Sequence, residues 1–186
     1  MTTVAHKGET FALWITGLPA SGKSAVSAAL SRQLVARGIQ TVILESDVLR
    51  KEFSSHPTYD PHDREDFYGS MAFIGKVLTD LGIAVIFDAT ANKRAYRERA
   101  RTKIPRFLEI YVDAPLEVCI QRDPKGIYRR ALEGQSQHVP GLQTEYEPPL
   151  HPDIVIHGDR ENPDLGAKRV MEVLEARQFI GAKPPH

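Results

Sequence analysis

Five short apolar segments recur along the 186-residue chain, and longer segments with mixed polarity separate them. Each apolar segment has four to six residues, and glycine, proline or charged residues lie near its ends. Short apolar runs of this length are typical of buried strands. We therefore expect strands at residues 11–16, 41–44, 84–87, 107–112 and 153–156.

The segments between these strands repeat apolar residues every three or four positions, as helices with one buried face do. The longest example includes Phe67, Met71 and Ile74. Asp60 is a suitable helix cap there, and Pro61 suits the first helical position. We expect helices at residues 23–37, 61–81, 93–102, 115–121 and 164–177.

The alternation of strand and helix predicts a single three-layer α/β domain, with a parallel five-stranded sheet and helices on both faces. Ligands in such sheets bind beyond the carboxyl ends of the strands. Polar residues follow several of these ends: Glu45 and Asp47 after the second strand, Asp88 and Thr90 after the third, and Asp113 after the fourth. We therefore expect the functional site at this edge.

The loop after the first strand reads GLPASGKS, from Gly17 to Ser24. Its spacing is that of a phosphate loop, in which backbone N–H groups and a helix N-terminus surround phosphate oxygens. Lys23 would reach the β and γ phosphates, and the Ser24 hydroxyl would bind Mg²⁺. The sequence therefore predicts a nucleoside triphosphate with Mg²⁺. The residues expected to hold the nucleotide here are Gly17, Leu18, Pro19, Ala20, Ser21, Gly22, Lys23, Ser24 and Ala25.

Two features narrow the class of phosphate-loop protein. The guanine-specific sequence Asn-Lys-x-Asp of signalling GTPases is missing, because Asn92-Lys93 is followed by Arg94 and Ala95. The segment 123–149 is polar and rich in Gly and Pro. We interpret it as a mobile lid that excludes water during phosphate transfer, with an ordinary solvated loop as the alternative. A small chain with a mobile lid that contains basic residues is typical of a kinase with a small-molecule acceptor.

Composition gives no argument for a nucleic-acid or membrane partner, because 24 basic side chains balance 24 acidic ones. No apolar run approaches the roughly 20 residues that span a bilayer, and MTTVAHKGET lacks a signal-peptide core. The single cysteine, Cys119, excludes an intrachain disulfide and is interpreted as a core residue. We expect a cytoplasmic protein.

Several stretches resemble the adenylylsulfate kinase family. They are PLEVCIQRDPKGIYRRALEG at the start of the lid, PGLQTEYEPPLHPDIVI at its end, LESDVLR after the second strand, and the pair Asp63-Arg64. The resemblance covers roughly residues 8–178. It implies a kinase that transfers the γ-phosphate of ATP to the 3′-hydroxyl of adenylylsulfate, and it makes a homodimer a reasonable expectation.

The resemblance implies that Lys23 and Ser24 hold ATP and Mg²⁺. It also implies that Asp47 orients or deprotonates the acceptor hydroxyl, or holds the metal through water. The residues alone leave another interpretation of Asp47 open, as a helix N-cap before Val-Leu-Arg.

The other roles that the resemblance implies belong to basic side chains. Arg50 and Arg64 would contact anionic groups of the acceptor, and Arg122 would lie against the ATP base. Lys125 and Arg129 would add positive charge over the phosphates. Taken alone, Arg50 and Arg64 could be surface residues, and Arg122 could pair with Asp123 or another neighbour.

Departures from the family pattern cluster on the acceptor side. Val48 and Phe67 stand where the family has Asn, and Val139 replaces a lid phenylalanine that would stack on the acceptor's adenine. The family's Ile-Ser-Pro-Tyr-Arg reads Thr-Ala-Asn-Lys-Arg, with Asn92 in place of the proline. Asp88 is a gain, because an apolar strand that ends in Asp is typical of a Mg²⁺ site.

Two alternatives therefore stay open. One is the same chemistry on another acceptor, such as a cytidine diphosphate derivative or a small alcohol. The other is a nucleotide-binding regulator without transfer activity.

Overall fold

The computed structural model of the protein describes residues 10–54 and 57–181, so most of the N-terminal segment MTTVAHKGET lies outside the described residues. A parallel five-stranded sheet in the order β2-β3-β1-β4-β5 forms its centre. The predicted strands are all present, with ends that shift by one residue. Their bounds are β1 Ala12–Thr16, β2 Thr41–Glu45, β3 Ala84–Asp88, β4 Phe107–Asp113 and β5 Ile154–His157.

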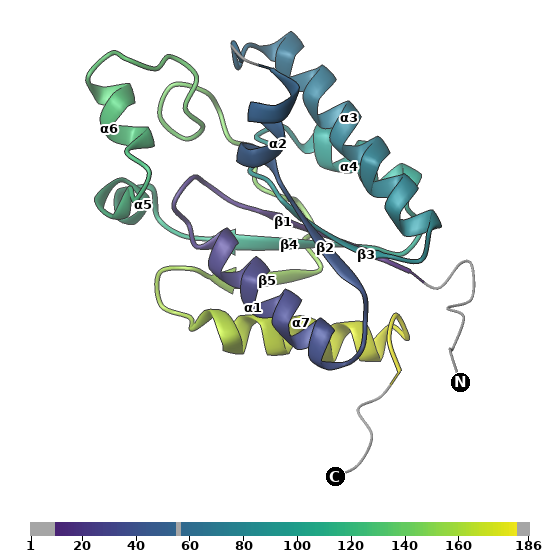
Figure 1. Cartoon of the computed structure of the whole chain (residues 1–186). Coiled ribbons are helices and arrows are strands. Elements are labelled where there is room, and N and C mark those ends of the chain that lie inside the picture. The colour runs from purple at the N-terminus through teal and green to yellow at the C-terminus, as the bar shows by residue number, and fades with distance from the viewer. Residues whose placement is uncertain (1–9, 55–56, 182–186) are drawn as a thin grey trace.

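Helices cover both faces of this sheet, which confirms the predicted three-layer arrangement (Figure 1). One face carries α1 (Lys23–Ala36) and α7 (Pro163–Ala176), and the other carries α3 (Pro61–Asp80) and α4 (Arg94–Lys103). Three shorter helices follow the carboxyl ends of β2 and β4. They are α2 (Ser46–Phe53), α5 (Leu116–Arg122) and α6 (Ile127–Leu132).

The central strand β1 is apolar up to its last residue, Thr16, because both of its faces are covered. Leu13 and Ile15 pack in the core beneath α1 and α7. Ala12 and Trp14 point to the opposite core, where the Trp14 ring stacks on Phe87 with 4.5 Å between centroids. A strand that is buried on both faces fixes the position of the loop that follows it.

The N-terminus of α3 has the predicted cap. The Asp60 carboxylate accepts hydrogen bonds from the backbone N–H groups of His62 and Asp63, and Pro61 occupies the first turn. The alternative interpretation of Asp47 as an N-cap is wrong. Glu45 occupies that position of α2, and Asp47 lies within the first turn.

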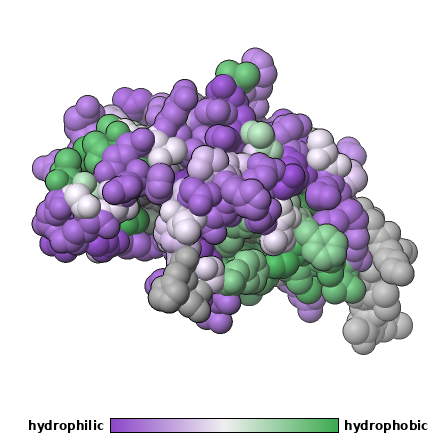
Figure 2. Space-filling model, turned by 90° about the horizontal axis from the view of Figure 1, so that it is seen from above, coloured by the Kyte–Doolittle hydropathy of each residue, from purple (hydrophilic) through white to green (hydrophobic). Residues whose placement is uncertain are grey.

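The outer side of α3 exposes several large apolar side chains. Phe73, Val77 and, just after the helix, Leu81 are all exposed. Figure 2 looks down on this side of the molecule and shows apolar areas within a mostly hydrophilic surface. Across residues 10–54 and 57–181, no helix is long and apolar enough to cross a membrane.

Candidate active site

The loop between β1 and α1 has the backbone geometry of a phosphate-binding loop. Gly17 and Gly22 have φ angles of 152° and 110°, in a region that favours glycine. A Cβ atom at Gly17 would also collide with the carbonyl oxygen of Val112. The loop therefore needs glycine at this position, and it leads directly into the N-terminus of α1, where backbone N–H groups attract anions.

Lys23 folds back over this loop. Its ammonium group donates hydrogen bonds to the carbonyl oxygens of Gly17, at 3.1 Å, and Leu18, at 2.8 Å. Burial lowers the pKa of Lys23, and the nearby carboxylates of Asp88 and Asp47 offset part of that effect. The phosphate loop thus holds a buried positive charge that no carboxylate contacts directly in the described part of the chain.

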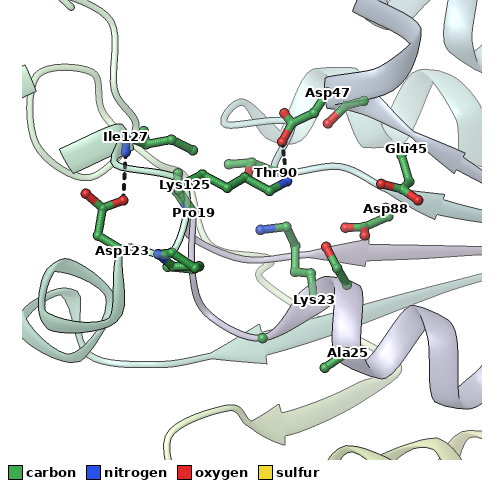
Figure 3. Close-up of a pocket in the computed structure, with 15 residues that line it drawn as sticks. Pro19, Lys23, Ala25, Glu45, Asp47, Asp88, Thr90, Asp123, Lys125 and Ile127 are labelled. Carbon is green, nitrogen blue, oxygen red and sulfur yellow. Dashed lines mark hydrogen bonds and ion pairs between the residues drawn. The ribbon is translucent and has the colours of Figure 1, made fainter. Parts of the chain in front are cut away.

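A cavity of about 290 Å³ opens over the loop (Figure 3). Ser24, Glu45, Asp47 and Asp88 supply oxygen atoms to its wall, and Glu45 and Asp88 are neighbours across β2 and β3. The complete lining is Pro19, Ala20, Gly22, Lys23, Ser24, Ala25, Glu45, Ser46, Asp47, Asp88, Thr90, Asp123, Pro124, Lys125 and Ile127.

These oxygen donors fit Mg²⁺, a hard cation that takes one or two protein ligands and completes its shell with water and phosphate. Ser24 and Asp88, the two residues predicted to hold the metal, line the same cavity. Among the described residues, no group of three or more His, Cys, Asp or Glu side chains is placed to hold a metal by itself. The donor set therefore suits a metal that arrives with a nucleotide.

Asp47 and Lys125 join the predicted lid segment, residues 123–149, to the N-terminus of α2 across this cavity. The Lys125 ammonium donates to the Asp47 carboxylate at 2.7 Å, and this hydrogen bond raises the pKa of Lys125 (Figure 3). Both side chains are about half exposed. The structure thus brings together two of the predicted site residues that lie 78 positions apart in sequence.

A second cavity, of about 570 Å³, adjoins the first. The two share five lining residues: Pro19, Ser46, Asp47, Thr90 and Ile127. The remaining lining residues of the second cavity are Arg50, Pro57, Thr58, Tyr59, Arg64, Tyr68, Arg130, Gly134, Gln135, Ser136, Gln137, His138, Val139 and Pro140. Asp47 therefore stands at the junction of a phosphate site and an arginine-lined cavity.

Arg50 is held in that second cavity by charge and by aromatic rings. Its guanidinium donates to the Asp63 carboxylate at 2.6 Å. It also lies 3.9 Å from the centroid of the Phe67 ring and 4.7 Å from that of Tyr59. Arg50 is only 5% exposed, so the alternative interpretation as a surface arginine is wrong.

Arg64 is equally buried, at 5% exposure, and is likewise no surface residue. Its three guanidinium nitrogens donate to the carbonyl oxygen of Tyr59, the side-chain oxygen of Asn92 and the carbonyl oxygen of His138. Burial lowers the pKa of Arg64, and the nearby positive charge of Arg50 acts in the same direction. Both arginines predicted to contact the acceptor thus line one cavity.

The three residues that depart from the family pattern on the acceptor side lie in different surroundings. Phe67 is buried beneath Arg50 and supports its guanidinium. Val139 is buried in the apolar core of the lid, although it also lines the second cavity. Val48 is 52% exposed and belongs to neither cavity lining.

The predicted lid packs with α5 around a small apolar core that includes Cys119, Tyr128 and Val139. The Tyr128 hydroxyl donates to the carbonyl oxygen of Pro19, which seats the lid on the phosphate loop. The prediction that Cys119 is a core residue is confirmed, because its side chain is fully buried.

Two predicted lid-side contacts lie outside both cavity linings. Arg122 donates to the carbonyl oxygens of Gly158 and Asp159. In the structure its guanidinium therefore pairs with the loop after β5 and not with Asp123. The Arg129 backbone is fixed by the Asp123 carboxylate. Arg130, which sequence reasoning did not single out, lines the second cavity instead.

Sequence reasoning also missed Tyr59 and Asn92. Tyr59 precedes the capping residue of α3 and has a φ angle of 60°, a conformation that no sequence pattern signalled. In the sequence, Asn92 stands out only as a departure from the family pattern. Both gain their contacts from tertiary structure.

A phosphate loop at the end of a central parallel strand, with a buried lysine folded back over it, defines a phosphate-loop nucleotide-binding protein. The particular family follows from sequence. Residues 9–157 match the family model described as adenylylsulphate kinase, and the chain belongs to that family.

Individual relatives agree with this assignment. The adenylyl-sulfate kinase of Synechococcus sp. (strain JA-3-3Ab) is 34% identical over 168 residues, which cover 90% of this chain and 96% of that protein. The adenylyl-sulfate kinase of Halothermothrix orenii is 35% identical over 175 residues, with 94% of each chain covered. The structure of the Mycobacterium tuberculosis APS kinase CysC in complex with AMPPNP and APS aligns with a TM-score of 0.84 and 31% identity, and covers 89% of this chain and 98% of that one.

Proposed function

We propose that this protein is an ATP-dependent kinase that transfers the γ-phosphate to the 3′-hydroxyl of adenylylsulfate. The observation that carries the proposal is the position of Asp47 between two adjoining cavities. One cavity is built around a phosphate loop, and the other is lined by three arginines. A carboxylate at such a junction is suited to an acceptor hydroxyl that faces a terminal phosphate.

The first cavity would hold Mg²⁺-ATP. The backbone N–H groups of the loop and the Lys23 ammonium would contact the phosphates, since they form the positive part of the cavity wall. Ser24 and Asp88 would hold Mg²⁺, which neutralises charge on the phosphates during transfer. Arg122 lies beyond the cavity, on the side where α5 meets the loop after β5, and would lie against the base.

The second cavity would hold the acceptor. Adenylylsulfate carries negative charge on its phosphate and sulfate groups, and the guanidinium groups of Arg50, Arg64 and Arg130 supply positive charge along one cavity. Tyr59 presents a ring to the same cavity and is 44% exposed. It is suited to stacking on a base, which would offset the absence of the family's lid phenylalanine.

Transfer itself would depend mainly on position and charge. The Asp47 carboxylate would accept the hydrogen bond of the 3′-hydroxyl, orient its oxygen toward the γ-phosphate and take its proton. Lys125, which now contacts Asp47, would turn to the phosphates when nucleotide is bound. Arg129 would add charge from the following helix, α6.

The finer predictions on organisation are part of the proposal. We propose that the chain acts as one kinase domain with residues 123–149 as its lid, that it works in the cytoplasm, and that two copies form a homodimer. Sedimentation at several protein concentrations would test the last point. The comparisons do not favour the alternative acceptors or the regulator without transfer activity.

The test is release of ADP from Mg²⁺-ATP, first without acceptor and then with adenylylsulfate, a cytidine diphosphate derivative or a small alcohol. We expect strong stimulation by adenylylsulfate alone. Equal stimulation by another acceptor, or intact ATP binding with no stimulation at all, would overturn the proposal.

A further inference from the structure

Asn92 joins the acceptor cavity to the end of the lid. It lies in the loop after β3 and is 1% exposed. Its side-chain oxygen accepts a hydrogen bond from Arg64 at 2.7 Å, and its side-chain nitrogen donates to the carbonyl oxygen of Glu145 at 3.0 Å. Its own carbonyl oxygen accepts from the backbone N–H of Glu147 at 2.8 Å. One buried residue therefore uses both ends of its amide and its backbone.

Chemistry fixes the orientation of this amide. A guanidinium has only donors, and a backbone carbonyl has only lone pairs to offer. The oxygen of Asn92 must therefore face Arg64, and its nitrogen must face Glu145. A carboxylate has no donor for Glu145, and a small apolar side chain provides neither group.

The charge of Arg64 makes its placement important. Its partners at Tyr59, Asn92 and His138 are all neutral oxygens. The adjacent carboxylate of Asp63 is engaged by the Arg50 guanidinium and by the backbone N–H of Tyr59. Within the described residues, no carboxylate hydrogen-bonds to Arg64, so its charge stays available to an anion in the second cavity.

The backbone before Asn92 is built to hold it in place. Ala91 has a φ angle of 41°, a backbone conformation that residues other than glycine rarely adopt. The Ala91 N–H donates to the hydroxyl of Tyr68, and its carbonyl oxygen accepts from the buried guanidinium of Arg97. The unusual turn directs Asn92 toward Arg64 and is secured on both sides.

We propose that Asn92 is a positioning residue, which fixes the Arg64 guanidinium in the acceptor cavity and couples it to the lid. The proposal rests on the proposed function for its effect on catalysis. The coupling itself runs from Asn92 through Arg64 to the His138 carbonyl oxygen, and so to the lid turn at residues 139–144.

The kinetic test compares Asn92→Ala, Asn92→Asp and the matched control Arg94→Ala. The Arg94 side chain also holds the lid end, through Glu147 and Pro148, but it does not touch Arg64. With Asn92→Ala, we expect the KM for adenylylsulfate to rise about tenfold, because a hydrogen bond to a charged group is lost, while the KM for ATP stays within about twofold. Asn92→Asp should raise it further, because its carboxylate neutralises Arg64. Arg94→Ala should leave both values within about twofold.

A double-mutant cycle with Arg64→Ala separates positioning from a general loss of structure. If Asn92 acts through Arg64, Asn92→Ala adds almost nothing to the acceptor KM when Arg64 is already alanine. An equal effect in both backgrounds, or the same effect in Arg94→Ala, would overturn the proposal.

A second measurement decides the coupling without any activity. Hydrogen exchange is followed in the substrate-free protein for a peptide that covers residues 139–144, after circular dichroism has verified that each variant is folded. Asn92→Ala and Arg64→Ala should each speed exchange, and the double variant should speed it by less than the two separate effects combined. Exchange at the wild-type rate in Asn92→Ala would refute the coupling. Absence of adenylylsulfate-dependent turnover in the wild type would refute the proposed function alone.

Discussion

Replacement of Asp47 by asparagine separates a catalytic role of this carboxylate from a structural one. The change keeps the size of the side chain and removes its charge. Its only recorded side-chain partner in the described chain is Lys125, and both groups are about half exposed. An exposed pair of this kind contributes at most about 1 kcal/mol to stability, so the melting temperature should fall by no more than about 4 °C.

Loss of a positioned base should act far more strongly on the rate. Such groups contribute roughly 100- to 10,000-fold, which corresponds to about 3–5 kcal/mol of transition-state stabilisation. We therefore expect Asp47→Asn to lower kcat by at least about 100-fold while ATP binding, measured by calorimetry, stays nearly unchanged.

The matched control is Asp80→Asn, which likewise removes a carboxylate that pairs with a lysine, Lys76, on the surface. Asp80 lies in neither cavity lining, so kcat should stay within about threefold. If Asp47→Asn keeps kcat within about threefold of the wild type, or if both variants lose activity equally, the assigned role of Asp47 is wrong. Loss of turnover with intact ATP binding would also exclude a regulator without transfer activity.

Three further predictions concern the two cavities. Burial lowers the pKa of Lys23, so the free enzyme loses this positive charge at a pH below the ordinary 10.5. ATP affinity should therefore decline as the pH rises through that range, and Lys23→Arg should flatten the decline. Asp88→Asn should raise the Mg²⁺ concentration for half-maximal rate about tenfold or more, and a shift no larger than that of Asp80→Asn would count against Asp88 as a metal ligand. Tyr59→Ala should raise the acceptor KM about tenfold by loss of stacking; an unchanged KM would show that the base does not lie on this ring.

Much of the fold follows from local patterns. The buried strand β1, the phosphate loop and the capped start of α3 each depend on neighbouring residues, so the sequence predicts them well. The helix α2 is different. Its sequence SDVLRKEF is mostly polar, and Arg50 is its only buried residue in the structure. Its helical conformation depends on Arg50 packing between the rings of Phe67 and Tyr59, which periodicity does not reveal.

The candidate site also contains residues that the sequence predicts and residues that only the folded structure reveals. Lys23, Ser24 and Asp88 could be predicted because a motif or a strand end carries them. The ion pair of Asp47 with Lys125 joins residues from two distant segments, and only the folded lid brings them together. Asn92 shows the limit most clearly, since an amide matters there only because its neighbours need one acceptor and one donor.

The central claim is tested most directly by the fate of the γ-phosphate. Purified protein is incubated with ATP labelled at the γ position, Mg²⁺ and adenylylsulfate, and the products are separated and identified by mass and by phosphorus NMR. The account predicts that the label appears on the ribose 3′ position of adenylylsulfate, in equal amount to the ADP formed. Label that is released as inorganic phosphate, or that remains in ATP although ATP binds, would contradict it.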